Sequence, residues 1–423
     1  MAAGPVGRGL TAAAAPPETL ELGAVRVHSP VILAPMAGVT DAPFRGVCRE
    51  FGEEALRASP RGAALLGNAE PGVDAPAGLY VAEMVTARAL VEGNTRSWQM
   101  VEPDPSERVR SVQLYGTDAG SLGAAARLLV ERSLVDHLDL NFGCPVPKVT
   151  RKGGGAAIPW KRDLFRDIVT SVVGAVDRAA PGGPGSIPVT VKMRIGIDDD
   201  HTTALDAGEV AEAAGVAGVG LHARTQEQHY SGAARWEWIA RLKDHLSVPV
   251  FGNGDVFVGP DATEMMRQTG CDAVTIGRGA QGRPWLFADV VASLWGLDRP
   301  GPVTLDQARR VLLDHARRTV ALDVDEARAM REMRKHVGWY LKGFPLGGEA
   351  RRDLNLVSSL AELEDRLSVL DGSLTLPPDH AGKGIRAGGA KRPHLPHGWL
   401  DSQELTDNER SGLLESDDGG SGG

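Results

Sequence analysis

Eight short apolar segments, most followed by a stretch with helical periodicity, recur at spacings of roughly 25 to 50 residues. They are residues 31–34, 80–82, 111–115, 135–140, 188–193, 217–221, 248–251 and 272–276. Helix-like stretches between them include 121–133, 162–178, 204–214 and 260–269. Alternating strands and helices predict a parallel sheet, and eight such units predict a (β/α)8 TIM barrel, an α/β fold of about 250 residues. We therefore expect a barrel over residues 20–297.

The rest of the 423-residue chain is interpreted as additions to that barrel. Residues 1–19 are rich in Ala and interrupted by Pro, and we expect a flexible tail there. Residues 53–78 lack clear periodicity and are interpreted as an insertion. After a Pro and Gly linker, helices are expected over 305–320, 326–342 and 354–370, which form a small C-terminal helical domain over 302–370. A disordered acidic tail is expected over 371–423.

The cysteines and the hydropathy indicate the compartment. Cys48, Cys144 and Cys271 are odd in number, far apart and without a CxxC pair, which argues against a disulfide framework or a metal site. No apolar run approaches the roughly 18 residues of a membrane helix. We expect a monomeric cytoplasmic protein with no metal and no membrane partner, and we interpret Cys48 and Cys271 as structural.

Net charge alone argues against a nucleic-acid partner, but its distribution does not. The chain carries −9 overall, yet residues 401–423 contribute seven acids and one base. Residues 328–352 carry seven bases and two acids, and helical spacing brings several of these bases to one face. By itself such a face is an ordinary solvated surface. Beside a site that acts on RNA, Arg331, Arg334 and Lys335 would form a phosphate track.

The turn after the fourth apolar segment contains a cysteine. Asn141 and Cys144 follow the segment, and Lys148, Arg151, Lys152 and three glycines come next. In a barrel this turn lies at the C-terminal rim, so a thiol would lie beneath a flexible cationic lid. A lone cysteine in such a turn is usually inert and buried. Here other polar residues are expected at the same rim. An ordinary solvated surface does not explain why they gather there, so a functional site is indicated.

These rim residues suit an anionic cofactor. Lys192 and Arg194 share a parity on the fifth segment, so both are expected to point the same way. Glycine-rich turns after the seventh and eighth segments, with Arg278 beside them, predict a phosphate site. A cofactor with a phosphate tail and a ring that gains negative charge on reduction, such as FMN, would use both. A Rossmann site is not indicated, because no GxGxxG follows a strand.

Several strings closely resemble the tRNA-dihydrouridine synthases, in their bacterial branch. They include VILAPMAGVTDAPFR, VQLYG, LDLNFGCPVPKVTRKGGGAAI, VKMRIG, HARTQEQHYSGAARW, FGNGDV, IGRGAQGRPW and MRKHVGWYLKGFP, in order over about 25–350. The resemblance implies an FMN-containing TIM barrel, followed by a helical tRNA-binding domain, that reduces uridine in tRNA at the expense of NADPH. The insertion and the tail lie outside the matching motifs.

The matching positions imply roles for individual residues. Cys144 is implied to be the catalytic acid, and Asn141 to contact the uracil ring. Lys148, Arg151, Arg194 and Arg224 are further expected to contact RNA. The residues implied to hold FMN are Pro35, Met36, Ala37, Gln113, Lys192, His222, Asn253, Gly254, Asp255, Gly277 and Arg278.

The chemistry makes this assignment intelligible. Saturating the C5=C6 bond of uracil needs a hydride at C6 and a proton at C5, and a thiol with an ordinary pKa of ~8.5 is still protonated at neutral pH. The target base must also leave the tRNA fold to reach a barrel mouth.

Two alternatives stay open. One is a flavin barrel acting on a free pyrimidine, such as a dihydroorotate dehydrogenase, and the other is an RNA-binding or RNA-folding protein with a barrel scaffold. Turnover of free uracil or orotate would support the first, and full cellular function of Cys144→Ala would support the second.

Overall fold

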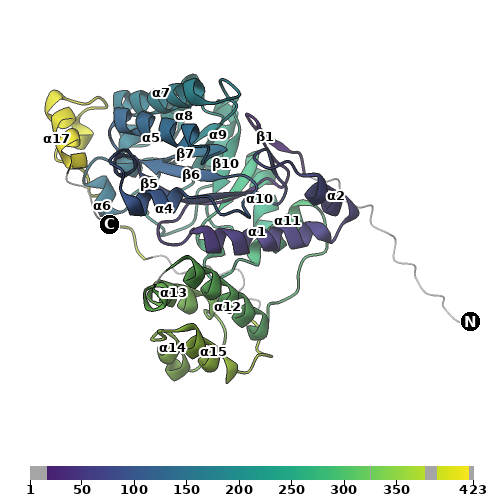
Figure 1. The fold of residues 1–423 in the computed structure, drawn as a ribbon. Coiled ribbons are helices and arrows are strands. Elements are labelled where there is room, and N and C mark those ends of the chain that lie inside the picture. Colours follow the sequence, from purple (N-terminus) through teal and green to yellow (C-terminus); the bar gives the residue numbers. More distant parts are fainter. Residues whose placement is uncertain (1–16, 324, 377–387, 419–423) are drawn as a thin grey trace, which may run out of the picture.

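The computed structural model describes residues 17–323, 325–376 and 388–418. Eight parallel strands close into a barrel in chain order, and Figure 1 shows helices packed around it. The barrel strands are β3 (Val31–Leu33), β5 (Leu79–Thr86), β6 (Ser111–Tyr115), β7 (His137–Phe142), β8 (Val189–Arg194), β9 (Gly218–His222), β10 (Val250–Asn253) and β11 (Ala273–Ile276). The predicted (β/α)8 barrel is confirmed.

Helices follow most of the strands and cover the outside of the barrel. They are α1 (Ala42–Arg57), α2 (Pro60–Asn68), α3 (Ala87–Val91), α4 (Thr95–Val101), α5 (Ala119–Glu131), α6 (Pro147–Thr150), α7 (Arg162–Ala179), α8 (Ala204–Ala213), α9 (Glu237–His245), α10 (Gly259–Thr269) and α11 (Leu286–Leu294). Short 3-10 helices lie at η1 (Gly155–Trp160) and η2 (Arg278–Ala280).

The alternation along each strand separates an apolar exterior from a polar interior. Leu138 and Leu140 of β7 belong to the apolar core shared with the surrounding helices, whereas Asp139 between them takes part in a polar network with β6 and β8. In β8, Val191 and Met193 likewise belong to that core, and Lys192 between them lines a cavity. Because side chains alternate across a strand, this pattern places a row of polar groups inside the barrel.

A small sheet seals the opposite end of the barrel. Strand β1 (Leu20–Leu22) pairs antiparallel with β2 (Val25–Val27), which pairs parallel with β4 (Asp74–Ala75). Their apolar side chains form a cluster with Ile32, Leu79 and Phe251 from the barrel strands. This apolar cluster fills the end of the barrel opposite the C-terminal rim.

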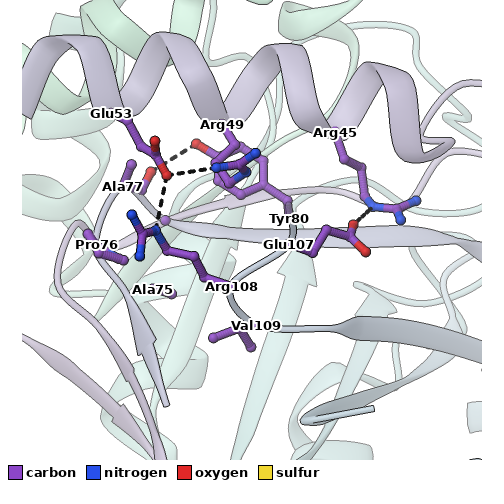
Figure 2. A pocket seen from close by; sticks show the side chains of 11 residues that line it. Arg45, Arg49, Glu53, Ala75, Pro76, Ala77, Tyr80, Glu107, Arg108 and Val109 are labelled. Atoms are coloured by element: carbon purple, nitrogen blue, oxygen red, sulfur yellow. Dashed lines mark hydrogen bonds and ion pairs between the residues drawn. The ribbon is translucent and has the colours of Figure 1, made fainter. Parts of the chain in front are cut away.

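The region interpreted as an insertion lies between the first two barrel strands and has regular structure. Helix α1 runs on to Arg57, Pro60–Asn68 forms α2 with Ser59 as its N-cap, and Asp74–Ala75 joins the small sheet. Glu53 is buried and accepts hydrogen bonds from Arg49, Arg57 and Arg108 at 2.8, 3.1 and 3.3 Å. Figure 2 shows Glu53 between Arg49 and Arg108 beside a small pocket of about 20 Å³. Short Ala and Gly residues concealed the periodicity.

The C-terminal helices form a separate cluster on one side of the barrel (Figure 1). They are α12 (Leu305–Leu322), α13 (Glu326–Tyr340), α14 (Gly348–Leu354) and α15 (Leu360–Ser368). Trp285 of the barrel contributes to their apolar core, and Arg318 of α12 pairs with Glu50 of α1 at 2.7 Å. The single helix predicted over 354–370 is wrong, because an N-cap at Ser359 starts α15 after a break.

The described parts of the predicted tail are ordered. Leu305 donates its amide to the Leu374 carbonyl at 2.6 Å, so residues up to 376 still belong to the helical domain. Residues 388–418 return to the barrel and form η3 (Trp399–Asp401) and α17 (Asp407–Asp418), which lies beside α7 in Figure 1. Composition alone suggested disorder, but Trp399 is only 1% exposed. Most of the predicted N-terminal tail, together with 377–387 and 419–423, lies outside the described residues.

We expect Glu53→Ala to destabilise the protein by about 2 kcal/mol, because it removes a buried carboxylate that accepts hydrogen bonds from three partly exposed arginines. Thermal unfolding followed by circular dichroism would measure the change. Glu54→Ala, which removes an exposed carboxylate one residue further along α1, serves as the control. Equal melting temperatures for the two variants would contradict a stabilising role for this ion-pair cluster.

Candidate active site

A cavity of about 480 Å³ opens at the C-terminal ends of the barrel strands. It is lined by every residue expected to hold the cofactor and by the expected catalytic cysteine. These are Pro35, Met36, Ala37, Gln113, Cys144, Lys192, His222, Asn253, Gly254, Asp255, Gly277 and Arg278. Asn141 and Arg194, expected at the RNA substrate, line it as well. Met84 of β5 lines the cavity too, so residues in or directly after all eight barrel strands contribute to it.

The backbone around Cys144 is fixed from three sides. Asn141 accepts hydrogen bonds through Oδ1 from the amides of Gly143, at 3.1 Å, and Cys144, at 2.9 Å. The Ala156 amide donates to the Cys144 carbonyl at 3.1 Å, and Arg194 Nε donates to the Gly143 carbonyl at 2.7 Å. The thiol is therefore held at the cavity wall by a defined turn.

Burial sets the protonation state of this thiol. It raises the pKa of Cys144 above its ordinary value, and the Val146 amide and the nearby Arg194 oppose the shift only in part. A thiol with a raised pKa is a poor nucleophile at neutral pH and an available proton donor. The environment therefore favours the acid role over the nucleophile role.

A buried polar network, which the sequence reasoning missed, orients Asn141. Asp139 accepts hydrogen bonds from Gln113 Nε2 and Thr190 Oγ1, both at 2.6 Å. With its Nε2 facing Asp139, Gln113 presents Oε1 to Asn141 Nδ2 at 2.8 Å. Asn141 then presents its own oxygen to the Cys144 turn. The sequence signal for this network is Asp139 itself, an acidic residue between two leucines of a strand expected to be buried.

Four cations converge on one side of the cavity. Burial lowers the pKa of Lys192 to about 8 and that of Arg194 to about 10, and it keeps His222 neutral by holding its pKa well below the usual range. Lys192 Nζ donates to Asn253 Oδ1 at 2.9 Å. Arg224 is buried and forms an ion pair with Asp255 at 2.7 Å, whereas Arg278 lies farther from it at 3.5 Å. The excess of positive charge predicts an anionic ligand.

These residues fit the two ends of a flavin mononucleotide. The glycines after β10 and β11 let backbone approach a phosphate closely, and Arg278 supplies charge there. At Gly254, with φ of +134°, a Cβ would lie 2.6 Å from the Ala234 Cβ, so the turn requires glycine. Lys192 lies deeper on the inner face of β8, where a cation would stabilise a ring that gains negative charge.

Tyr230 is a second residue that sequence reasoning did not assign. Its ring lies 4.6 Å from the Arg278 guanidinium carbon and 5.4 Å from that of Arg194, and it lines the cavity. The carbonyls of Thr225 and His229 in the same loop accept from Arg194 Nη1 at 3.0 and 2.8 Å. The loop after β9 is therefore tied to the Cys144 turn through one arginine.

The predicted lid does not have flexible hinges. Lys148 and Arg151 are exposed beside the cavity, as expected for contacts to RNA, but Gly153 and Gly155 are buried. Their positive φ values of 74° and 56° place them in tight turns, which is the reason that the segment needs glycine. The segment is a short helix α6 followed by the 3-10 helix η1, so the expectation of a flexible loop was wrong.

The basic residues of α13 are placed differently from one another. Arg331 is exposed, and Lys335 Nζ lies 3.4 Å from the position that a Cβ on Gly38 would occupy, next to the cavity wall at Ala37. Arg334 instead donates to the Val357 and Leu356 carbonyls at 3.3 and 3.2 Å. Lys335 thus lies near the cavity wall, about one helical turn from the exposed Arg331.

Across the described residues, no group of three or more His, Cys, Asp or Glu side chains is arranged to hold a metal ion. Within the same part of the chain, no helix combines the length and apolarity that a bilayer crossing requires.

We expect the stability difference between wild type and Asp139→Asn to depend on pH. Burial raises the pKa of Asp139 to about 6, so the folded protein binds this proton more tightly than the unfolded chain does. The stabilisation is complete at acid pH and is lost as pH rises from about 4 through 6. Thermal unfolding of flavin-free protein at pH 4, 5, 6 and 7 would show the wild-type advantage shrinking with pH. Asp200→Asn controls for loss of an exposed charge, and a constant difference would contradict the expectation.

Comparisons with known proteins agree on one family. A family model described as Dihydrouridine synthase (Dus) matches residues 32–373. A probable tRNA-dihydrouridine synthase of Mycobacterium tuberculosis is 47% identical over 386 residues, 91% of this chain and 93% of its own length. That of Mycobacterium leprae is 48% identical over 396 residues, 91% of this chain and all of its own length. The tRNA-dihydrouridine synthase B of Pseudomonas syringae pv. tomato is 36% identical over 342 residues, 79% of this chain and 89% of its own.

One similar solved structure is more distant than these relatives. Histamine dehydrogenase from Rhizobium sp. 4-9 aligns with a TM-score of 0.44 at 11% identity, over 84% of this chain and 64% of its own, and supports no argument about function. The family model and the relatives described above are sufficient to assign the family. This chain belongs to the dihydrouridine synthase family.

Proposed function

We propose that this protein reduces the C5=C6 bond of specific uridines in tRNA to 5,6-dihydrouridine, with FMN as its cofactor and NADPH as the electron donor. The observation that carries the proposal is the Cys144 thiol, whose pKa is raised by burial, fixed at the wall of a cavity that is also lined by Lys192, Arg194 and Arg278. The activity stated in the names of the relatives agrees with this reading.

The residues of the chain divide the work of the reaction. When bound, the flavin supplies the hydride that C6 receives. Cys144 donates its proton to C5, and its raised pKa keeps that proton available at neutral pH. Asn141 holds the Cys144 turn through Oδ1 and lies beside the space that a uracil would occupy. Lys192 and Arg278 hold the cofactor at its ring and its phosphate.

The tRNA is proposed to lie across the rim between the barrel and the helical domain. Lys148 and Arg151 are exposed on one side of the cavity, and Arg331 is exposed on α13 at the other. Backbone phosphates spanning the two would hold the tRNA while the target base leaves the stack and enters the cavity. The three cysteines are all free, which accords with a cytoplasmic, reducing location.

We expect Cys144→Ala to lower kcat for tRNA reduction by about 10²- to 10⁴-fold, the usual contribution of a general acid. Dihydrouridine formed in unmodified tRNA by purified, flavin-loaded protein would be quantified by mass spectrometry. Flavin content and tRNA affinity should match wild type, and Cys271→Ala controls for loss of a buried thiol. Turnover of free uracil or orotate but not of tRNA would overturn the proposed substrate. Unchanged dihydrouridine formation by Cys144→Ala would overturn the proposed acid.

We expect Arg331→Ala to raise the KM for tRNA several-fold and to reduce the slope of log affinity against log salt by about one, the loss of a single phosphate contact. Its kcat should stay unchanged, because α13 does not contribute to the cavity wall. Arg267→Ala, on the barrel helix α10 and highly exposed, is the matched control. Identical salt slopes for both variants would exclude Arg331 from the tRNA path.

A further inference from the structure

Residues 388–413 connect the cavity to the outside of α7. At one end, Gly388, Gly389 and Lys391 line the cavity, and the Lys391 amide donates to the Glu227 carbonyl at 2.9 Å. At the other end, α17 lies beside α7 (Figure 1). The matched family model ends at residue 373, so this segment lies outside the part of the chain that defines the family.

Trp399 is the centre of this contact. Its indole Nε1 donates to the Ala157 carbonyl at 3.0 Å. A Cβ on Gly153 would lie 2.7 Å from the Trp399 ring and 3.0 Å from Leu413, so the glycine turn is packed directly against the C-terminal segment. The indole therefore supports the segment Gly153–Ala157 both by packing and by a hydrogen bond.

The other side of the same short segment holds Cys144. The Ala156 amide donates to the Cys144 carbonyl at 3.1 Å. A Cβ on Gly155 would lie 2.6 Å from that carbonyl oxygen and 3.2 Å from the Cys144 Cβ. Within this segment of five residues, Gly153 and Ala157 contact Trp399, whereas Gly155 and Ala156 contact Cys144.

Ionic and backbone bonds fix Trp399 in its place. Lys161 is fully buried, and its Nζ contacts Glu409 Oε1 at 2.8 Å and the Ser402 carbonyl at 3.0 Å, while the ammonium lies 5.0 Å from the Trp399 ring centroid. The Arg162 amide donates to the Gln403 carbonyl at 2.7 Å. A buried ammonium that loses its carboxylate is strongly unfavourable, so the segment is expected to stay docked.

We propose that Trp399 is a positioning residue for the reaction, which acts by holding the segment Gly153–Ala157 against the Cys144 turn. This inference rests on the proposed role of Cys144. Trp399 does not touch substrate, and its effect reaches the thiol only through the loop between them. A loop that is supported on one side alone would let the thiol sample positions away from C5, and small displacements of a proton donor slow catalysis.

The test compares full-length Trp399→Ala and Trp399→Phe with Trp238→Ala, which removes a partly buried indole from α9 on the outer layer of the barrel. The first readout is the rate at which iodoacetamide alkylates Cys144, resolved from Cys48 and Cys271 by peptide mass. The second readout separates flavin reduction by NADPH from single-turnover reduction of tRNA. Circular dichroism would show that each variant is folded.

In Trp399→Ala we expect iodoacetamide to alkylate Cys144 about ten times faster than in wild type, and single-turnover reduction of tRNA to be about ten times slower. The rate of flavin reduction and the KM for tRNA should be unchanged. Trp399→Phe keeps the ring packing but loses the hydrogen bond to Ala157, and should fall in between. Trp238→Ala should behave as wild type in both readouts. If Trp399→Ala does not fold, the proposal is tested by comparing the alkylation and tRNA-reduction rates of Trp399→Phe with those of Trp238→Ala.

Alkylation at the wild-type rate, or tRNA reduction that slows only in parallel with flavin reduction, would overturn the proposal. Because alkylation needs no tRNA, it distinguishes failure of the positioning role from failure of the proposed function. A protein inactive on tRNA whose Cys144 still becomes more reactive in Trp399→Ala would overturn the proposed function and keep the positioning role.

Discussion

The orientation of the Cys144 turn depends on a buried carboxylate, Asp139. An ionised carboxylate can only accept hydrogen bonds, so Gln113 must turn its NH2 group toward it. That leaves the Gln113 oxygen for Asn141, and the Asn141 oxygen for the amides of Gly143 and Cys144. Each amide group in this chain has its direction set by the one before it. In a low-dielectric interior, reversing any of them would leave buried polar groups unpaired.

The same barrel interior carries an electrostatic cost. Most TIM barrels fill this space with layers of branched apolar side chains, whereas here Lys192 and Arg194 occupy it with their pKa values lowered by burial. Part of the positive charge is balanced by Asp255, which pairs with Arg224. An anionic cofactor would balance more of it. Buried charge that is not fully balanced is expected at a site whose residues serve ligand binding at the expense of stability.

Two segments outside the barrel approach its rim from different sides. Helix α13 brings Lys335 next to Gly38 at the first strand end, and residues 388–391 reach the loop after β9. The first would meet the tRNA backbone in the proposed function, and the second continues into the segment that contains Trp399. In that proposal the barrel supplies the chemistry, and the two additions border the path of the substrate and the support of the Cys144 turn.

The sequence by itself determined the barrel and the ring of residues around its mouth. Apolar periodicity located seven of the eight strands to within about two residues, because packing against helices on one side and closure of the sheet leave few other patterns. The segment predicted as 80–82 is longer, since β5 extends to Thr86. Strand ends of one barrel meet at one rim, so Cys144, Lys192 and Arg278 could be placed together without coordinates. Local signals also located α12 and most of α13, where caps and spacing agree.

Only the tertiary structure decided the contacts between segments distant in the chain. Nothing in the sequence pairs Asp139 with Gln113 and Thr190, and Glu53 hydrogen-bonds with Arg108 across 55 positions. The acidic composition of the C-terminal segment predicted disorder, yet Trp399 and Glu409 find Ala157 and Lys161 more than 200 positions away. Composition and periodicity report local preference, whereas burial of a single tryptophan and one ion pair depends on a surface that exists only once the barrel has closed.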